Sequence, residues 1–148
     1  VKKIARLEQG VVFSGSPRTL FEVFGDKKTK GLIEILTKEY DKRNIYIFVL
    51  NIPEKESIKR NSRRVACSVC KTPLLAKYQN LKSCPFCCGK LEYRIDDRKE
   101  IILARLKEYR ERTLPIQKKL RKRGYKIINI NGEPLPEKVH KSIIVSLK

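Results

Sequence analysis

The chain gathers all five of its cysteines within a stretch of 22 residues. Cys67 and Cys70 form one C-x-x-C pair, Cys84 and Cys87 form a second, and Cys88 follows directly. A C-x-x-C turn lets two thiolates bind one ion, and two such turns supply the tetrahedral ligand set that Zn²⁺ prefers. The pattern therefore predicts a structural zinc site with Cys67, Cys70, Cys84 and Cys87 as its metal ligands.

Disulfides and redox chemistry fit the five cysteines less well than zinc does. Disulfides are typical of exported proteins, but the first residues, VKKIARLEQ, lack the apolar core of a signal peptide. A redox-active pair, or chance, does not account for two C-x-x-C pairs separated by 13 residues. Pro85 and Gly89 favour the tight turns of a zinc site. We interpret Cys88 as a bystander, because a four-ligand zinc is closed to further ligands and catalyses nothing.

The charge of the chain favours anionic partners. The 148 residues contain 35 Lys and Arg against 16 Asp and Glu, a formal net charge of +19. Such a charge attracts nucleotides, nucleic acid or a ribosome-like surface. The longest apolar runs, at 45–50 and 143–147, are too short to span a membrane, so we expect no membrane partner and a cytoplasmic location. Because the chain begins at Val1 and has no Met, either an initiator Met was removed or the chain is part of a longer protein.

The elements that must position the cysteines follow an α/β pattern. Strands are predicted at 10–14, 44–51 and 125–130, and helices at 2–9, 18–24, 32–40, 53–60, 97–123 and 136–147. Pro115 should kink the long helix, Asp97 and Glu100 have the spacing of a capping box, and Gly124 should end that helix.

Strands that alternate with helices form a parallel sheet with helices on both faces. We therefore predict a three-layer α/β/α fold with a parallel sheet, interrupted by a small zinc-ribbon-like β module. The predicted domains are two core parts, 1–63 and 94–148, and an inserted zinc-binding module at 64–93.

Five segments resemble, in the same order, motifs of the adenylate kinase family of nucleoside-monophosphate kinases, in the form whose small mobile domain (LID) contains zinc. They are FSGSPRT (13–19), similar to a DGFPRT-type motif; RNSRRVACSVC (60–70), similar to the start of the LID; CPFCCGKLEYRIDD (84–97), similar to its end; DDRKEIILARLKEYRERTLPI (96–116), similar to the following long helix; and INING (128–132), similar to the last strand and turn. The resemblance covers nearly the whole chain, and the matching order of five modest motifs makes it specific.

The resemblance implies a P-loop kinase-like fold and the reaction ATP + AMP ⇌ 2 ADP, assisted by Mg²⁺. It implies that Arg18 binds the AMP phosphate and that Arg60 stacks on the ATP adenine. Arg94 and Arg105 match arginines that bind phosphates when the LID closes. Arginine suits these roles because its guanidinium binds phosphate oxygens bidentately and keeps its charge.

Arg64 matches a further phosphate-binding arginine, and the resemblance makes Arg64, Arg94 and Arg105 the catalytic candidates. Alignment on Cys67 favours Arg64 for this role, whereas alignment on the RRV triplet favours Arg63. The two aspartates Asp96 and Asp97 match carboxylates that hold the LID arginines in place. The zinc would then stiffen a LID that is too small to fold alone.

The chain also departs from the family pattern. It has no GxxxxGK followed by Ser or Thr, the loop that binds ATP phosphates, and it lacks the AMP-binding helices. Ser14 replaces the family's Asp, and Glu22 stands where a Gln is usual. The resemblance is therefore to the C-terminal portion of such a kinase. We expect the chain alone to be inactive and to need an N-terminal segment, or a second chain, that carries the P-loop.

Three hypotheses remain, in order of preference. The first is part of an adenylate kinase, which binds ATP, AMP and ADP. The second is a non-catalytic relative that senses adenine nucleotides through Arg18 and the LID. The third is a zinc-ribbon protein that binds RNA or a ribosome, which the charge of +19 favours but an aromatic content of 7% does not. The basic residues at 110–123 are interpreted as a solvated helix face that could together form a polyanion-binding patch.

Overall fold

The computed structural model describes residues 1–75, 78 and 80–147, and it divides into two compact units. Unit 1 contains Val1–Asn51 and Glu108–Lys148, and unit 2 contains Ile52–Lys107. The predicted zinc-binding insert at 64–93 lies inside unit 2, and its boundaries stay a prediction. No helix in the described ranges is both long enough and apolar enough to cross a bilayer.

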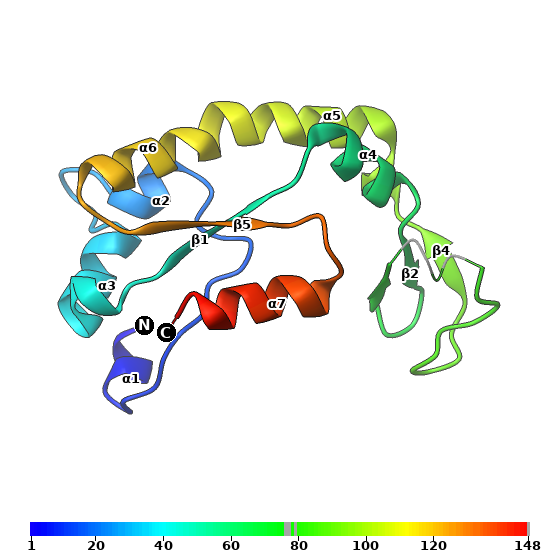
Figure 1. Ribbon diagram of the computed structural model, residues 1–148, viewed down its shortest axis with the longest axis horizontal. Coiled ribbons are helices and arrows are strands. Elements are labelled where there is room, and N and C mark those ends of the chain that lie inside the picture. Colours follow the sequence, from blue (N-terminus) through cyan, green and yellow to red (C-terminus); the bar gives the residue numbers. More distant parts are fainter. Residues whose placement is uncertain (76–77, 79, 148) are drawn as a thin grey trace. The chain divides into compact units, whose positions relative to one another are not determined.

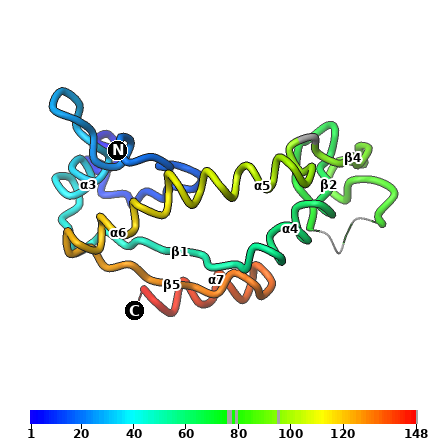
Figure 2. The backbone as a smooth tube through the Cα atoms, turned by 90° about the horizontal axis from the view of Figure 1, so that it is seen from above, coloured from blue at the N-terminus to red at the C-terminus, as the bar shows by residue number. Residues whose placement is uncertain are grey.

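Unit 1 is built on a two-stranded parallel sheet. Strand β1 (Ile47–Asn51) pairs with β5 (Ile127–Asn131), so that Ile47 lies opposite Ile127 and Asn51 opposite Asn131. The two strands run side by side in Figures 1 and 2. Both contain β-branched Ile or Val residues, which pack well on a pleated surface. The predicted α/β fold with a parallel sheet is confirmed.

Helices cover both sides of this sheet. Figure 1 shows α6 and α7 on opposite sides of β1 and β5. The helices of unit 1 are α1 (Lys2–Ala5), α2 (Leu20–Phe24), α3 (Leu32–Tyr40), α6 (Leu114–Lys122) and α7 (Pro136–Val145), with a 3₁₀ turn at Lys42–Asn44. The core on the α6 side consists of Val23, Ile33, Ile116 and Leu120, with Phe24, Ile45, Ile47, Tyr125 and Ile127 packed against it.

The strand predicted at 10–14 is wrong. These residues belong to no strand, and Val12 and Phe13 are 92% and 43% exposed. A strand is held by backbone hydrogen bonds to a neighbouring strand. In the described residues β1 and β5 pair only with each other, so residues 10–14 have no partner strand. The predicted N-terminal helix is also shorter than expected, because α1 ends at Ala5 and Leu7 is 67% exposed.

The long helix is interrupted where Pro115 predicts. Helix α5 (Lys99–Glu108) leads into one turn of π-helix (Tyr109–Thr113), and α6 then begins at Leu114. Proline has no N–H and its ring crowds the preceding turn, so the regular α-helical ladder cannot continue through it. At the other end of α6, Gly124 has φ +74° and its N–H donates to the Arg121 carbonyl, while the Tyr125 N–H donates to Leu120. This is the glycine-dependent helix end that the sequence predicts.

Unit 2 contains a small antiparallel sheet of order β3-β2-β4. The strands of this sheet are β2 (Val65–Cys67), β3 (Pro73–Leu74) and β4 (Leu91–Tyr93). The helices of unit 2 are α4 (Glu54–Ser62), a 3₁₀ turn at Ile95–Asp97, and α5 up to the unit boundary. Helix α4 follows Pro53, as predicted. Val65 and Leu74 are buried and lie opposite each other in the β2–β3 pairing.

Candidate metal centre and arginine site

Four cysteine thiols converge in unit 2. The Cys67 and Cys87 Sγ atoms are 3.4 Å apart, the Cys70 and Cys84 Sγ atoms are 3.7 Å apart, and all four lie within 4.8 Å of one another. Four sulfurs bound to one Zn²⁺ at about 2.3 Å form a tetrahedron with edges of about 3.8 Å. The cluster therefore has the size and donor set of a single tetrahedral metal site compatible with zinc.

Two equivalent turns present these thiols. The Lys71 N–H donates to the Cys67 carbonyl at 3.1 Å, and the Cys88 N–H donates to the Cys84 carbonyl at 2.9 Å. Lys71 and Cys88, each directly after a C-x-x-C pair, both have φ 58°. Each turn thus reverses at a residue in the left-handed conformation. Cys88 occupies that reversal position and is not one of the four clustered thiols.

Gly89 is required by the packing of the second turn. A Cβ atom at this position would lie 2.7 Å from Cys67 Sγ and 2.8 Å from Val69 Cγ2. Its carbonyl accepts a hydrogen bond from the Cys84 N–H at 2.8 Å. Any side chain at Gly89 would therefore push against a candidate metal ligand.

Local hydrogen bonds and neighbouring sulfurs shift the pKa values of Cys67, Cys70 and Cys87 by different amounts and in different directions. Hydrogen bonds with Thr72, chiefly with its hydroxyl and secondly with its backbone, lower the pKa of Cys70 to about 6. Burial raises the pKa of Cys67, but the backbone N–H groups of Cys70 and Val69 outweigh it, and the net shift is downward. The Gly89 N–H lowers the pKa of Cys87, but the neighbouring Cys67 and Cys70 sulfurs oppose a further negative charge and raise it to about 11. A bound cation would remove this opposition, since it stabilises all four thiolates.

Arg64 forms a bidentate ion pair with Asp97. Its Nε donates to Asp97 Oδ2 at 2.9 Å and its terminal nitrogen donates to Oδ1 at 2.7 Å. The Asp97 side chain is only 3% exposed and that of Arg64 is 26% exposed. Because α5 begins two residues later, at Lys99, and the carboxylate binds Arg64, the predicted capping box of Asp97 with Glu100 is wrong. The role that the family resemblance implies for Asp97, holding an arginine, agrees with this contact.

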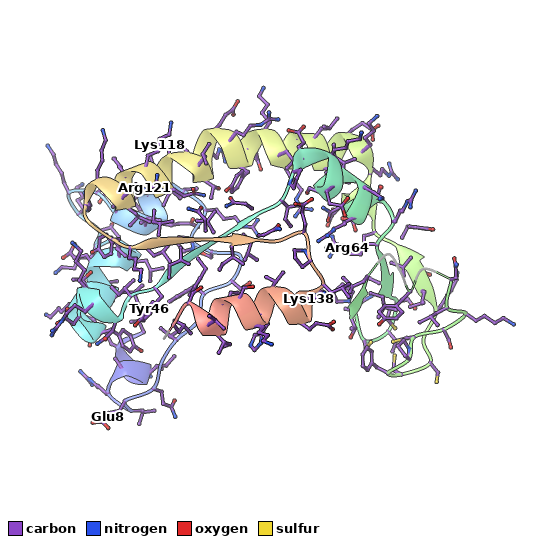
Figure 3. The ribbon with its side chains drawn as sticks, in the orientation of Figure 1. Glu8, Tyr46, Arg64, Lys118, Arg121 and Lys138 are labelled. Carbon is purple, nitrogen blue, oxygen red and sulfur yellow. The ribbon has the colours of Figure 1, made fainter. Side chains whose placement is uncertain are left out.

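The small sheet brings Arg64 and Arg94 to the same end. Val65 of β2 lies opposite Tyr93 of β4, so Arg64 directly precedes one strand and Arg94 directly follows its partner. Cys67, at the other end of β2, is one of the clustered thiols. Arg94 is exposed and contacts Asp96 at 3.4 Å. Figure 3 labels Arg64 beside this sheet.

The remaining sequence-predicted arginines of unit 2 lie on helices. Arg60 of α4 is partly buried and pairs with Glu56 at 2.8 Å. Arg105 of α5 is exposed and forms no ion pair with a carboxylate in the described part of the chain. Arg63, the alternative to Arg64, is exposed at the end of α4.

Arg18 belongs to unit 1. Its side chain is exposed, its Nε donates to the Gly15 carbonyl, and its own carbonyl accepts from the Thr113 hydroxyl at 3.0 Å. The following residues form a capping box that sequence analysis missed. Thr19 Oγ1 accepts from the Glu22 N–H at 3.2 Å, and Glu22 Oε2 accepts from the Thr19 N–H at 2.9 Å.

The T-x-x-E spacing at the start of α2 is the signal that could have revealed this motif. Hydrogen bonds from the backbone N–H groups of Arg18 and Thr19 lower the pKa of Glu22. The acid at the position where the family usually has Gln is therefore engaged in holding the start of a helix.

Comparison with curated proteins identifies several similar chains, all adenylate kinases, although no protein-family model matches. The chain is 30% identical to the adenylate kinase of Dehalococcoides mccartyi over 152 aligned positions, covering 100% of this chain and 67% of that protein. It is 30% identical to the enzyme of Acetivibrio thermocellus (93% of this chain, 61% of that one) and 29% identical to that of Chlamydia trachomatis (97% and 55%). It thus spans roughly three fifths of the length of these relatives. The chain belongs to the adenylate kinase family.

Proposed function

We propose that this chain supplies the LID and the phosphate-binding arginines of an adenylate kinase that interconverts ATP and AMP with two ADP. The observation that carries the proposal is the β2–β4 pairing, which joins the thiol cluster at one end to Arg64 and Arg94 at the other. A Zn²⁺ held by the four clustered cysteines would fix both strands. Their ends would then present two guanidinium groups to a bound nucleotide.

In this proposal the arginines act on charge and position rather than through covalent chemistry. The terminal phosphoryl group of ATP passes to a phosphate oxygen of AMP, and the bond to the ADP oxygen breaks. Negative charge is spread over the transferring group, and Mg²⁺ and arginines stabilise it. Arg64, Arg94 and Arg105 would bind these oxygens, Arg60 would stack on the ATP adenine, and Arg18 would bind the AMP phosphate.

The reaction also needs a phosphate-binding loop, which these 148 residues do not contain. We propose that a segment outside this sequence supplies that loop, in the same polypeptide or in a second one. The 148 residues alone would bind nucleotide without transferring phosphate. A non-catalytic nucleotide sensor makes the same binding prediction, but no added P-loop segment would then restore activity.

The proposal is tested by nucleotide binding to the zinc-loaded 148-residue protein, measured by titration calorimetry with ATP and with AMP. We expect Arg94→Ala to weaken ATP binding by about 10-fold or more, because a charged hydrogen bond to phosphate contributes about 1.5–3 kcal/mol. Arg18→Ala should weaken AMP binding to a similar extent. Arg43→Ala is the matched control, since Arg43 is exposed and pairs with Asp41. Unchanged affinities in both variants would contradict the proposal.

A further inference from the structure

Segment 110–126 carries an unusual concentration of positive charge that the proposed function does not use. It contains eight Lys and Arg residues and a single acidic residue, Glu111. The cations are Arg110, Arg112, Lys118, Lys119, Arg121, Lys122, Arg123 and Lys126. The whole of unit 1 has 21 Lys and Arg against 10 Asp and Glu, so this segment supplies +7 of the unit's formal charge of +11.

The packing of α6 turns these cations toward solvent. Ile116 and Leu120 are 6% and 5% exposed and belong to the core. By contrast, six cations are exposed and form no ion pair with a carboxylate in the ranges that the structure describes: Lys118, Lys119, Arg121, Lys122, Arg123 and Lys126. We call these six residues the basic face. Lys118, Arg121 and Lys122 have i, i+3 and i+4 spacing, which places them as neighbours about 5–6 Å apart on the helix.

Aromatic rings hold part of the basic face in position. Lys119 Nζ lies 5.4 Å from the ring centre of Phe24, and Arg123 Cζ lies 4.4 Å from the same ring. The Arg123 carbonyl accepts a hydrogen bond from Lys42 Nζ at 2.7 Å, and Lys42 also lies 4.9 Å from the ring centre of Tyr125. Cations that are already ordered lose less entropy when they bind an anion. Lys42 extends the positive surface beyond α6.

The chemistry of this surface selects among polyanions. A membrane-binding helix inserts a continuous apolar face into the lipid, but Ile116 and Leu120 of α6 are buried in the core, and Leu114 at its start is the one leucine of α6 that is partly exposed (36%). Single-stranded nucleic acid is typically bound by stacking on exposed aromatic faces, whereas cations lie over Phe24 and Tyr125 here. A nucleic-acid duplex requires only cations spaced to contact phosphates, since its backbone carries one negative charge per about 1.7 Å of helix axis.

We propose that the basic face binds the phosphate backbone of a nucleic-acid duplex without reading its bases. Each phosphate that a cation neutralises contributes about 0.9 to the slope of log affinity against log salt concentration. The two sides of the sheet provide a matched comparison. Lys118 and Arg121 lie on α6, and the exposed Lys138 and Lys141 lie on α7, on the other side of the sheet (Figures 1 and 3).

The experiment measures the binding of the zinc-loaded protein to a 20-base-pair DNA duplex and an RNA duplex of equal length, by fluorescence anisotropy between 50 and 200 mM salt. We expect comparable affinities for the two duplexes. The variant Lys118→Glu/Arg121→Glu should bind at least about 10-fold more weakly at 50 mM salt, and Lys118→Ala/Arg121→Ala should lower the salt slope by about 2. The control Lys138→Glu/Lys141→Glu changes the net charge equally and should weaken binding by less than about 3-fold.

Several results would overturn the proposal. Equal losses in the α6 and α7 variants would show an effect of net charge alone. Absence of duplex binding at 50 mM salt would also refute it, as would tighter binding to single strands or to vesicles that contain phosphatidylserine. Circular dichroism of each variant confirms that it is folded. ATP binding should be unchanged in all of them, which separates this proposal from that of the kinase function.

Discussion

Replacing Cys88 with Gly should stabilise unit 2 and leave its metal site intact. Cys88 has φ 58°, a left-handed conformation that costs an L-residue about 1–2 kcal/mol and that glycine adopts freely. Glycine also gives the unfolded chain more conformational entropy, and this offsets about 0.4–1 kcal/mol of that stabilisation. The expected net gain in the free energy of unfolding is therefore about 0.5–1 kcal/mol. Loss of the Cys88 thiol should not weaken zinc binding, because Cys88 lies outside the four-sulfur cluster.

The assay is thermal unfolding of the zinc-loaded protein by calorimetry, with zinc content measured by native mass spectrometry. The midpoint for Cys88→Gly should rise by about 3 °C, with one zinc per chain retained. Cys88→Ser removes the thiol but keeps the backbone strain, so it should show no gain. Lys71→Gly tests the equivalent position of the first turn. Its gain should be smaller, because Lys71 Nζ also donates to the Ser68 carbonyl at 2.7 Å.

Two results would refute this reasoning. Loss of zinc from Cys88→Gly would make Cys88 a ligand, so that the four-sulfur assignment would fail. An equal gain in Cys88→Ser would place the effect in the thiol rather than in the backbone conformation.

Two further predictions concern charge in unit 2. Zinc binding should release more protons to solvent at pH 5.5 than at pH 8. The metal displaces the proton of Cys87, whose pKa is raised to about 11, at both pH values. Cys70, with a pKa of about 6, is protonated mainly at the lower pH and releases a proton mainly there. Affinity should fall as pH falls, and calorimetry in two buffers of different ionisation enthalpy measures the release; a constant value would contradict the assignment. Asp97→Asn should lower the free energy of unfolding, measured by urea denaturation, by about 2–3 kcal/mol, because Arg64 loses its buried partner. Asp96→Asn, which removes the exposed pair with Arg94, should lower this free energy by less than about 0.5 kcal/mol. Equal losses in the two variants would refute the distinction between a buried and an exposed ion pair.

The cluster of four thiols could be predicted from sequence because its geometry is local. Each C-x-x-C pair closes its own turn through a backbone hydrogen bond between residues four apart, and only one further association is needed to bring the two turns together. Pro115 and Gly124 were equally predictable, since a missing N–H and a positive φ act on the adjacent backbone alone.

The errors occur where a distant partner decides the outcome. The apolar run at 10–14 has the composition of a strand, but no strand of the described chain pairs with it. Asp97 has the spacing of a helix cap, yet its carboxylate binds Arg64, 33 positions earlier in the chain. Two charge-assisted hydrogen bonds at a site that is almost closed to water outweigh one bond to a helix N-terminus. Local pattern alone cannot rank these alternatives, because it contains no information on the position of Arg64.

On the proposed function, the same contacts explain how a metal that touches no substrate can control phosphate binding. Strand β2 is only three residues long, with Arg64 before it and the ligand Cys67 at its end. So short a strand has little stability of its own, and its pairing with β4 depends on what fixes its ends. The thiol cluster fixes one end, and the Arg64–Asp97 pair fixes the other. Losing the metal would therefore release the register that places Arg64 beside Arg94, and nucleotide affinity would fall although every arginine is still present.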